Sequence, residues 1–219
     1  KSVITPVPKV SNSCLPSDYR PISLTSSVCR VMESVILDRI VEHFEKEGLF
    51  SNNQHGFLRK RGTTTCMHEC IDSWVDSFEK GYSIDILYID LAKAFDSIVH
   101  VRLLRRLQQC GIAGLLYKWI EIWLTRRTQC VKINNCLSSE RFVRSGVPQG
   151  SVLGPILFII YMATLDTHLK FCKLRYFADN AKIFMRVDNQ NDAFKFQQEI
   201  NNIVRWSENM QLNIAISAG

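Results

Sequence analysis

The sequence lacks an apolar run long enough to cross a lipid bilayer. Its longest apolar stretch, residues 152–163, falls short of the roughly 20 residues that a membrane helix needs, and Gly154 and Pro155 interrupt it. Residues 1–9 also lack the apolar core of a signal peptide. We therefore expect no membrane partner and an intracellular protein of the cytoplasm or the nucleus, with no visible targeting signal.

The cysteines lack the spacing of a metal site, because none of the eight belongs to a Cys-x-x-Cys pair. Cys66, His68 and Cys70 lie close together in the sequence and raise the alternative of zinc. On a helix, however, residues two positions apart point to different sides, and no second ligand pair follows at a zinc-finger spacing. We expect reduced, partly buried thiols, as in a reducing compartment.

Repeats and low-complexity segments are also absent, and 219 residues with 46% hydrophobic and 22% charged side chains suffice for a real core. The formal net charge of +6 suits a polyanionic partner such as a nucleic acid. A basic globular protein without such a partner fits the charge equally well.

The periodicity of apolar residues predicts an α+β protein rather than a regular βαβ alternation. We expect extended or turned chain over residues 1–21, a polar loop over 51–62 and a buried strand over 84–91. Two hairpins are predicted, one over 128–144 around Asn134-Asn135 and one over 173–187 around Ala178 to Asn180. Helices are predicted over 26–47, 63–80, 97–109, 112–125, 155–168 and 190–210.

Two acids have a context that points to chemistry. Asp90 ends the predicted strand over 84–91, and Asp179 lies at the turn of the second hairpin. An acid at the tip of an apolar strand is costly unless a partner stabilises it, and a divalent cation is one such partner. The alternative is that these acids only cap turns or helices, a role for which Asp85 and Asp96 are rivals.

Five sequence blocks follow one another along nearly the whole chain. They are Asp18-Tyr19-Arg20-Pro21-Ile22-Ser23-Leu24, Asn53-Gln54-His55-Gly56-Phe57 with Arg61-Gly62-Thr63-Thr64, Asp90-Leu91-Ala92-Lys93-Ala94-Phe95-Asp96, Gly146-Val147-Pro148-Gln149-Gly150-Ser151-Val152-Leu153-Gly154-Pro155, and Phe177-Ala178-Asp179-Asn180. In content and order they resemble the blocks of reverse transcriptases from non-LTR (LINE-like) retrotransposons.

The resemblance implies a right-hand polymerase fold with fingers and palm, in which helices back an antiparallel palm sheet. It implies a fingers-like region with the first palm helices over residues 1–83 and a palm over 84–219, with no thumb. The implied activity is RNA-directed DNA polymerisation, with an RNA template, a DNA primer and dNTPs as partners.

The resemblance also implies a metal site. Asp90 and Asp179 match the carboxylates that bind two Mg²⁺ or Mn²⁺ ions, and the carbonyl of Leu91 matches a further ligand. Asn180 occupies the remaining catalytic position, where the family usually has a second acid next to Asp179. A neutral amide there predicts weaker metal binding.

Further positions match nucleotide-binding residues of the family. Phe95 matches the bulky residue that stacks under the incoming sugar and excludes a 2′-hydroxyl, although a core aromatic is the alternative. Gln149 and Gly150 match the loop that holds the template–nucleotide pair. Arg61 matches the fingers arginine that grips the triphosphate, with a solvated basic loop as the alternative, and Lys182 is a further candidate near the metal site.

Two departures from the family keep other functions open. Besides Asn180, residues 214–219 lack the lysine expected shortly after Leu212-Asn213. The alternative to an active polymerase is therefore a catalytically impaired retrotransposon remnant that keeps the fold and at most binds nucleic acid. An RNA-directed RNA polymerase is a third reading, against which Phe95 and the block starting at Gly146 argue.

Overall fold

The computed structural model describes residues 1–215, and the chain divides into two compact units. Unit 1 comprises Lys1–Leu49 and Phe95–Leu157, and unit 2 comprises Phe50–Ala94 and the chain from Phe158 onward. The chain therefore passes between the units after Leu49, after Ala94 and after Leu157.

The expected boundary between residues 83 and 84 does not separate these units. The physical reason is packing between segments on both sides of that boundary. β3 (Ile84–Ile89) pairs with β8 (Asn180–Arg186) in unit 2, and Trp74, which precedes the boundary, packs against Phe184 of β8 in the same unit. The assignment of residues 1–83 to fingers and 84–219 to palm stays a prediction.

Three helices form the apolar core of unit 1. They are α1 (Ser27–Lys46), α4 (His100–Gln109) and α5 (Gly114–Thr125), and a short helix, α3 (Ala94–Ser97), precedes α4 where the chain re-enters the unit. Their fully buried side chains include Ile40, Leu103, Leu107, Ile120 and Leu124. The Ser26 side chain accepts a hydrogen bond from the Cys29 amide and so caps α1, as expected for a helix over 26–47.

The sheet of unit 1 is mixed. Its strands are β1 (Ser2–Pro8), β2 (Tyr19–Leu24), β4 (Thr128–Ile133), β5 (Cys136–Leu137) and β6 (Arg141–Phe142). β1 pairs antiparallel with β2 and parallel with β4, and β4 also pairs with β5 and β6. The predicted turn at Asn134-Asn135 connects β4 to β5, and the extended chain predicted over 1–21 holds β1, the short helix η1 (Pro16–Asp18) and the start of β2.

The sheet of unit 2 is antiparallel, with strands in the order β3, β8, β7 (Lys173–Phe177). Its register runs from Ile84 opposite Arg186 to Ile89 opposite Ala181. The expectation of a buried strand over 84–91 was wrong in one respect, because only Ile89 is buried in β3. β3 is an edge strand that pairs with β8 alone, so that Asp85 and Tyr88 are exposed.

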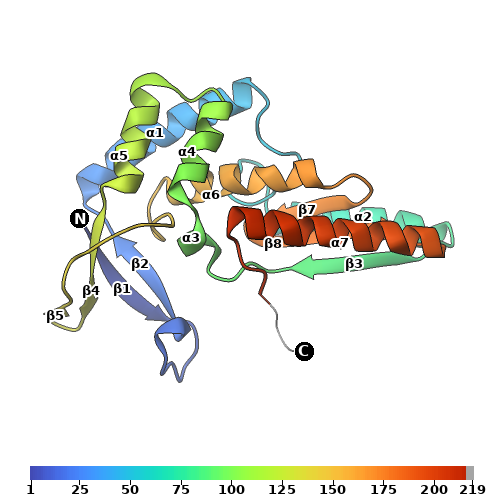
Figure 1. Ribbon diagram of the computed structural model, residues 1–219, viewed down its shortest axis with the longest axis horizontal. Coiled ribbons are helices and arrows are strands. Elements are labelled where there is room, and N and C mark those ends of the chain that lie inside the picture. The colour runs from blue at the N-terminus through green and yellow to red at the C-terminus, as the bar shows by residue number, and fades with distance from the viewer. Residues whose placement is uncertain (216–219) are drawn as a thin grey trace. The chain divides into compact units, whose positions relative to one another are not determined.

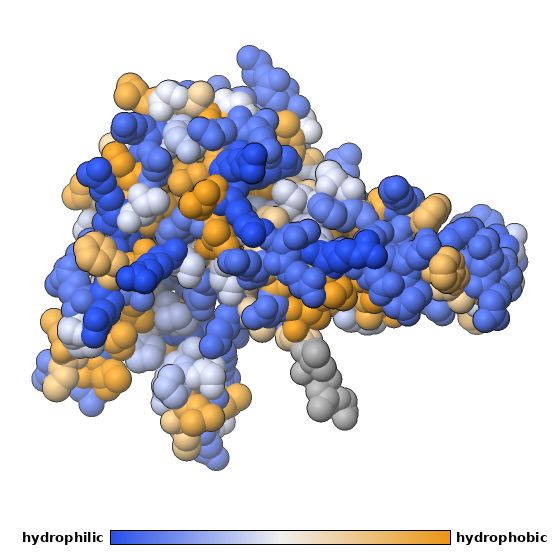
Figure 2. All heavy atoms as spheres, in the orientation of Figure 1, coloured by the Kyte–Doolittle hydropathy of each residue, from blue (hydrophilic) through white to orange (hydrophobic). Residues whose placement is uncertain are grey.

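Helices lie on both faces of this sheet. Figure 1 shows α7 (Gln190–Met210) in front of the sheet and α2 (Thr63–Glu79) behind it. Trp74 of α2 meets Phe184 of β8 edge-to-face, with ring centroids 5.7 Å apart. α7 buries Phe196, Ile203 and Trp206, whereas its outward face is mainly hydrophilic (Figure 2), as expected for an amphipathic helix over 190–210.

The helix predicted over 155–168 consists of an α-helix followed by a 3₁₀ helix. α6 covers Gly154–Met162, and a 3₁₀ segment, η2, continues through Ala163–His168. The loop predicted over 51–62 precedes α2 as expected.

No helix within residues 1–215 combines the length and the apolarity required to span a membrane. All eight cysteines are free thiols, of which Cys66, Cys70, Cys110 and Cys130 are buried.

Candidate catalytic site

The register of the unit 2 sheet brings the two predicted acids to the same end. Ile89, the last residue of β3, lies opposite Ala181 of β8, and Asp90 follows directly. Asp179 lies in the turn that joins Phe177 of β7 to Asn180 of β8. Residues that are far apart in the sequence therefore meet at the end of neighbouring strands, because antiparallel pairing places the end of one strand beside the start of the next.

The two acids at this end of the sheet interact electrostatically, as the pKa of Asp179 shows. Burial raises the pKa of the half-buried Asp179 carboxyl group, and the negative charge of Asp90 raises that pKa further. The hydrogen bond with its own backbone amide opposes both effects. Within residues 1–215, neither Asp90 nor Asp179 forms an ion pair with a basic side chain.

A cavity of about 390 Å³ opens beside Asp90, and three of the predicted site residues line it, whereas Asp179 is not among its lining residues. Asp90, Asn180 and Lys182 contribute to its wall, together with Thr63, Cys66 and Tyr88. The Lys182 ammonium lies 5.8 Å from the centre of the Tyr88 ring. The structure thus places an acid, an amide and a cation around one space in unit 2.

The donor set at this end suits a hard divalent cation. Asp90 and Asp179 offer carboxylate oxygens, and Mg²⁺ needs only one or two protein carboxylates when water and phosphate oxygens complete its octahedron. In the part of the chain that the structure describes, no group of three or more His, Cys, Asp or Glu side chains could hold a metal. Any ion here would depend on two carboxylates, on the predicted carbonyl ligand of Leu91 and on oxygens from substrate and water.

The backbone that follows Asp90 is fixed by the C-terminal segment. The Ala215 amide donates to the Asp90 carbonyl oxygen at 2.8 Å, and the Ala92 amide donates to the Asn213 carbonyl oxygen at 2.8 Å. Leu91 and Ile214 form an isolated antiparallel bridge, whose hydrogen bonds do not use the carbonyl of Leu91. Of the C-terminal residues that depart from the family, 216–219 lie outside the described chain.

The loop that precedes α2 contacts the turn that carries Asp179. Gln54 is 2% exposed, and its Oε1 atom accepts hydrogen bonds from the amides of Gly56 at 2.6 Å and Ala178 at 3.0 Å. The backbones of Asn53 and His55 both bond to Tyr176 of β7. Gln54 belongs to the block that starts at Asn53, but the sequence predicted no role for it.

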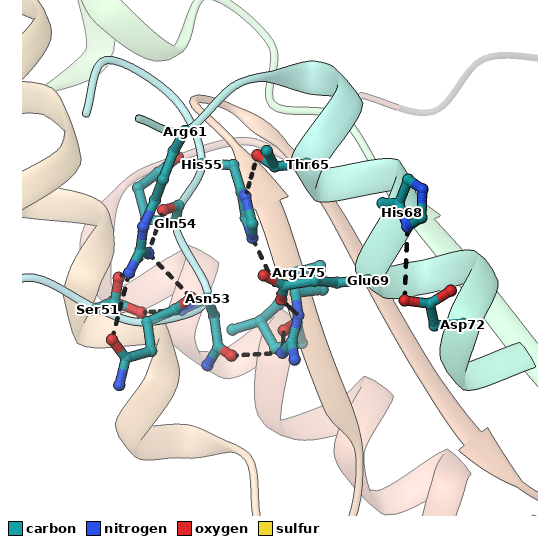
Figure 3. Close-up of polar contacts among 12 residues, drawn as sticks. Ser51, Asn53, Gln54, His55, Arg61, Thr65, His68, Glu69, Asp72 and Arg175 are labelled. Atoms are coloured by element: carbon teal, nitrogen blue, oxygen red, sulfur yellow. Dashed lines mark hydrogen bonds and ion pairs between the residues drawn. The ribbon is translucent and has the colours of Figure 1, made fainter. Parts of the chain in front are cut away.

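The Arg61 side chain bonds to backbone carbonyl oxygens of the loop that precedes α2, a role that triphosphate binding does not require. Its Nη1 atom donates to the carbonyl oxygens of Ser51 at 3.0 Å, Asn52 at 3.0 Å and Gln54 at 2.7 Å. Figure 3 shows the guanidinium group lying against this loop. The neighbouring Arg59 and Lys60 are exposed. The triphosphate role of Arg61 stays a prediction, and the structure adds a contact that fixes the loop.

A polar network continues from this loop into the sheet. Asp166 accepts from the Tyr176 hydroxyl at 3.2 Å and from Asn53 Nδ2 at 3.1 Å. Arg175 donates to Asn53 Oδ1 and to Glu69 Oε2, both at 2.6 Å (Figure 3). The network ties Asn53, the residue before Gln54, to β7 and to α2.

The other predicted nucleotide-binding residues, Phe95, Gln149 and Gly150, lie in unit 1. The Val147 amide donates to the Phe95 carbonyl oxygen at 2.8 Å, and Gln149 Nε2 donates to both carboxylate oxygens of Asp96, at 3.0 and 3.2 Å. Gly150 has a φ of +94°, which favours glycine. Within unit 1 the structure therefore holds the loop from Gly146 against the start of α3.

Glu33 of α1 is a buried residue of unit 1 that sequence reasoning missed. It is fully buried, and its Oε2 atom accepts from the amides of Val152 at 2.7 Å and Leu153 at 3.3 Å. Its Oε1 atom accepts from Trp123 Nε1 at 3.1 Å. Glu33 thus anchors the segment that directly follows Gln149 and Gly150, and a lone Glu within an apolar helical stripe was the only available signal.

The chain is similar to proteins of known description. It is 33% identical over 185 residues to the probable RNA-directed DNA polymerase from transposon X-element of Drosophila melanogaster, which covers 81% of this chain and 20% of that protein. It is 33% identical over 147 residues to the RNA-directed DNA polymerase from mobile element jockey of Drosophila funebris, covering 67% of this chain and 16% of that protein. The chain thus spans about a fifth of the length of these relatives.

Among solved structures, apo telomerase from Candida tropicalis superposes with a TM-score of 0.71 at 10% identity, covering 97% of this chain and 43% of that one. At this identity the similarity shows the fold alone, a mixed α/β polymerase fold consistent with fingers and palm. Residues 7–217 match the family described as reverse transcriptase (RNA-dependent DNA polymerase). This chain therefore belongs to the reverse transcriptase family, and its relatives are polymerases of non-LTR retrotransposons.

Proposed function

We propose that this chain contains the nucleotidyl-transfer core of an RNA-directed DNA polymerase, which extends a DNA primer with dNTPs on an RNA template. The observation that carries the proposal is the position of Asp90 and Asp179 at one end of the unit 2 sheet, where neither forms an ion pair with a basic side chain of residues 1–215. The names of the relatives, RNA-directed DNA polymerases, support the same activity.

In the proposed reaction, the 3′-hydroxyl oxygen of the primer bonds to the α-phosphorus of the dNTP. The bond from that phosphorus to the bridging oxygen breaks, pyrophosphate leaves with the electron pair, and the hydroxyl proton passes to solvent. Two bound Mg²⁺ or Mn²⁺ ions would lower the pKa of the hydroxyl group and neutralise charge on the leaving oxygens. Asp90, Asp179 and the carbonyl of Leu91 are the groups that would hold them.

Other residues would bind and select the nucleotide. Phe95 would exclude a 2′-hydroxyl from the sugar site, and the loop at Gln149 and Gly150 would support the template–nucleotide pair. Arg61 and Lys182 would neutralise phosphate charge, since a guanidinium group donates parallel hydrogen bonds to phosphate oxygens. Because phosphate contacts dominate nucleic-acid affinity, template binding should weaken as salt concentration rises.

Asn180 favours a second candidate, a catalytically impaired remnant that binds nucleic acid. This residue lines the same cavity as Asp90, and its amide supplies no negative charge where the family usually has an acid. Two cations would then share two carboxylates instead of three.

Primer extension on an RNA template, with dNTPs and either Mg²⁺ or Mn²⁺, tests the proposal. We expect weak synthesis by the unsubstituted chain, an increase with Asn180→Asp and complete loss with Asp90→Ala. Synthesis that persists in Asp90→Ala would contradict the assigned site. No synthesis by either the unsubstituted chain or Asn180→Asp would favour the remnant. In the same assay, Phe95→Ala should admit rNTPs, and unchanged selectivity would remove the gate role of Phe95.

A further inference from the structure

We propose that Gln54 is a positioning residue for the acidic turn, whose side-chain oxygen fixes the backbone at Ala178 and thereby places the Asp179 carboxylate for metal binding. The inference rests on the proposed function, which gives Asp179 its metal.

The turn that carries Asp179 needs an external support. Two residues, Ala178 and Asp179, connect β7 to β8, and Ala178 has a φ of +55°. Two-residue hairpin turns with positive φ at the first central position favour glycine there, because a Cβ atom makes that conformation costly. A strained residue of this kind persists only where its surroundings determine its conformation.

Gln54 provides that support from outside the hairpin. Its Oε1 atom accepts from the buried Ala178 amide at 3.0 Å, so that the peptide group between Phe177 and Ala178, at the entry to the turn, has a fixed orientation. The same oxygen accepts from the Gly56 amide at 2.6 Å. The Nε2 atom has no hydrogen-bond partner within residues 1–215, so the contribution of this side chain comes from its oxygen.

The loop can reach the turn only because of Gly56. A Cβ atom added there would lie 2.5 Å from the Ala178 nitrogen, which no real side chain tolerates. Arg61 in turn fixes the loop through the carbonyl oxygens of Ser51, Asn52 and Gln54 (Figure 3). Gln54 is therefore held in place on both sides, by its own backbone carbonyl and by the contacts of its side chain.

Loss of the Gln54 oxygen would leave the amide of Ala178 buried and unsatisfied, which is unfavourable. The turn would relieve that cost by rotating the peptide group toward water. Such a rotation changes the backbone torsions of Ala178 and thereby the Cα–Cβ direction of Asp179, the next residue. The expected consequence is a displaced carboxylate in an otherwise intact sheet.

Amide hydrogen exchange, measured by NMR on the 219-residue chain, tests the contact. Gln54→Met removes the acceptor at nearly constant length, and Gln54→Glu keeps an oxygen at that place. We expect the Ala178 amide to exchange at least tenfold faster in Gln54→Met, with protection largely restored in Gln54→Glu and unchanged amides within β8. Equal protection of the Ala178 amide in Gln54→Met would overturn the proposal.

Titration with Mn²⁺ tests the consequence, read as paramagnetic broadening of the Asp90 and Asp179 amide signals. Gln54→Met should need at least tenfold more Mn²⁺ than the unsubstituted chain. Two controls should not shift the titration. One is Gln197→Met on the exposed face of α7, and the other is Tyr161→Phe, which loses the hydroxyl bond to the Met210 carbonyl of the same unit.

The outcomes separate the two proposals. An unchanged Mn²⁺ titration in Gln54→Met, or a shift of the same size in Tyr161→Phe, would overturn positioning by Gln54 and leave the polymerase proposal intact. Broadening by Mn²⁺ that responds to Gln54→Met, in a chain that extends no primer, would contradict the proposed function and support the positioning role. No broadening in the unsubstituted chain would overturn the positioning role, because there would be no metal to position for.

Discussion

Asp90 and Asp179 lie at the same end of the unit 2 sheet, close enough for the charge of Asp90 to raise a pKa that burial has already raised at Asp179. A group whose folded pKa lies above its unfolded value destabilises the protein as pH rises through that range. At neutral pH the ionised Asp179 carboxylate therefore lowers the stability of the metal-free chain. This is expected of two acids that form a cation site, and not of acids that cap a turn.

Replacement of Asp179 by Asn should stabilise the metal-free chain at pH 7, because it removes a half-buried charge beside another acid. We expect thermal unfolding in the presence of a chelator to occur about 2–4 °C higher, which corresponds to roughly 1 kcal/mol at this chain length. Asp85→Asn, at an exposed position near the start of β3, is the matched control and should leave the midpoint unchanged. A lower midpoint for Asp179→Asn would mean that this acid serves the fold.

Glu33→Gln should destabilise unit 1 strongly. The carboxylate accepts from Val152, Leu153 and Trp123, and an amide NH₂ group turned toward any of these donors leaves that donor unsatisfied. Urea unfolding should show a loss of about 2–4 kcal/mol. Glu42→Gln, in the exposed ion pair with Arg39 on the same helix, should cost less than about 0.5 kcal/mol. Equal losses in the two variants would contradict the anchoring role of Glu33.

Sequence patterns predicted the parts of this structure that local chemistry determines. The amphipathic repeat over 190–210 matches α7, and the small and polar residues at Ala178 to Asn180 mark the turn between β7 and β8. Such features follow from spacing within one turn of helix or one hairpin, which the order of residues records directly.

The remaining features depend on partners distant in the sequence. Gln54 meets Ala178, and Glu33 meets Val152, only after the chain has folded, so that neither contact leaves a periodic signal. The exposure of β3 has the same origin, since an apolar run does not reveal whether a strand lies at the edge of a sheet. The carbonyl contacts of Arg61 likewise depend on how the loop folds back on itself.

Arg61→Lys should loosen the loop from Ser51 to Gln54, because an ammonium group on a flexible stem does not reproduce a planar fork across several carbonyl oxygens. We expect the His55 amide, which bonds to the Tyr176 carbonyl oxygen, to exchange at least fivefold faster. The exposed Arg59, changed to Lys, provides the control. If only the KM for dNTP rises and exchange at His55 stays the same, Arg61 serves phosphate binding without fixing the loop.

His100 should make unit 1 less stable in mild acid. It is 6% exposed, and its Nε2 atom lies 2.8 Å from the Gly146 carbonyl oxygen, an acceptor, so Nε2 carries the proton. Burial lowers the pKa of the imidazole, and the hydrogen bond to Gly146 only partly opposes this effect. Because the unfolded chain takes up the proton first, the unfolding free energy should fall as pH drops below about 6.5.

Denaturant unfolding between pH 7.5 and pH 5 measures this dependence. His100→Gln has no proton to gain, so its unfolding free energy should vary less with pH than that of the unsubstituted chain. The buried His55 also has a lowered pKa, chiefly through burial, and contributes a slope of the same sign in both proteins. Identical slopes would show that His100 does not contribute.

Calorimetric titration with Mn²⁺ of the unsubstituted chain, Asp90→Asn, Asp179→Asn and the double variant tests the central claim most directly. If one cation site needs both carboxylates, each single substitution should weaken binding at least tenfold, and the double variant should bind little worse than either single variant. Undiminished Mn²⁺ affinity in either single variant would contradict the shared site, as would losses that simply add in the double variant.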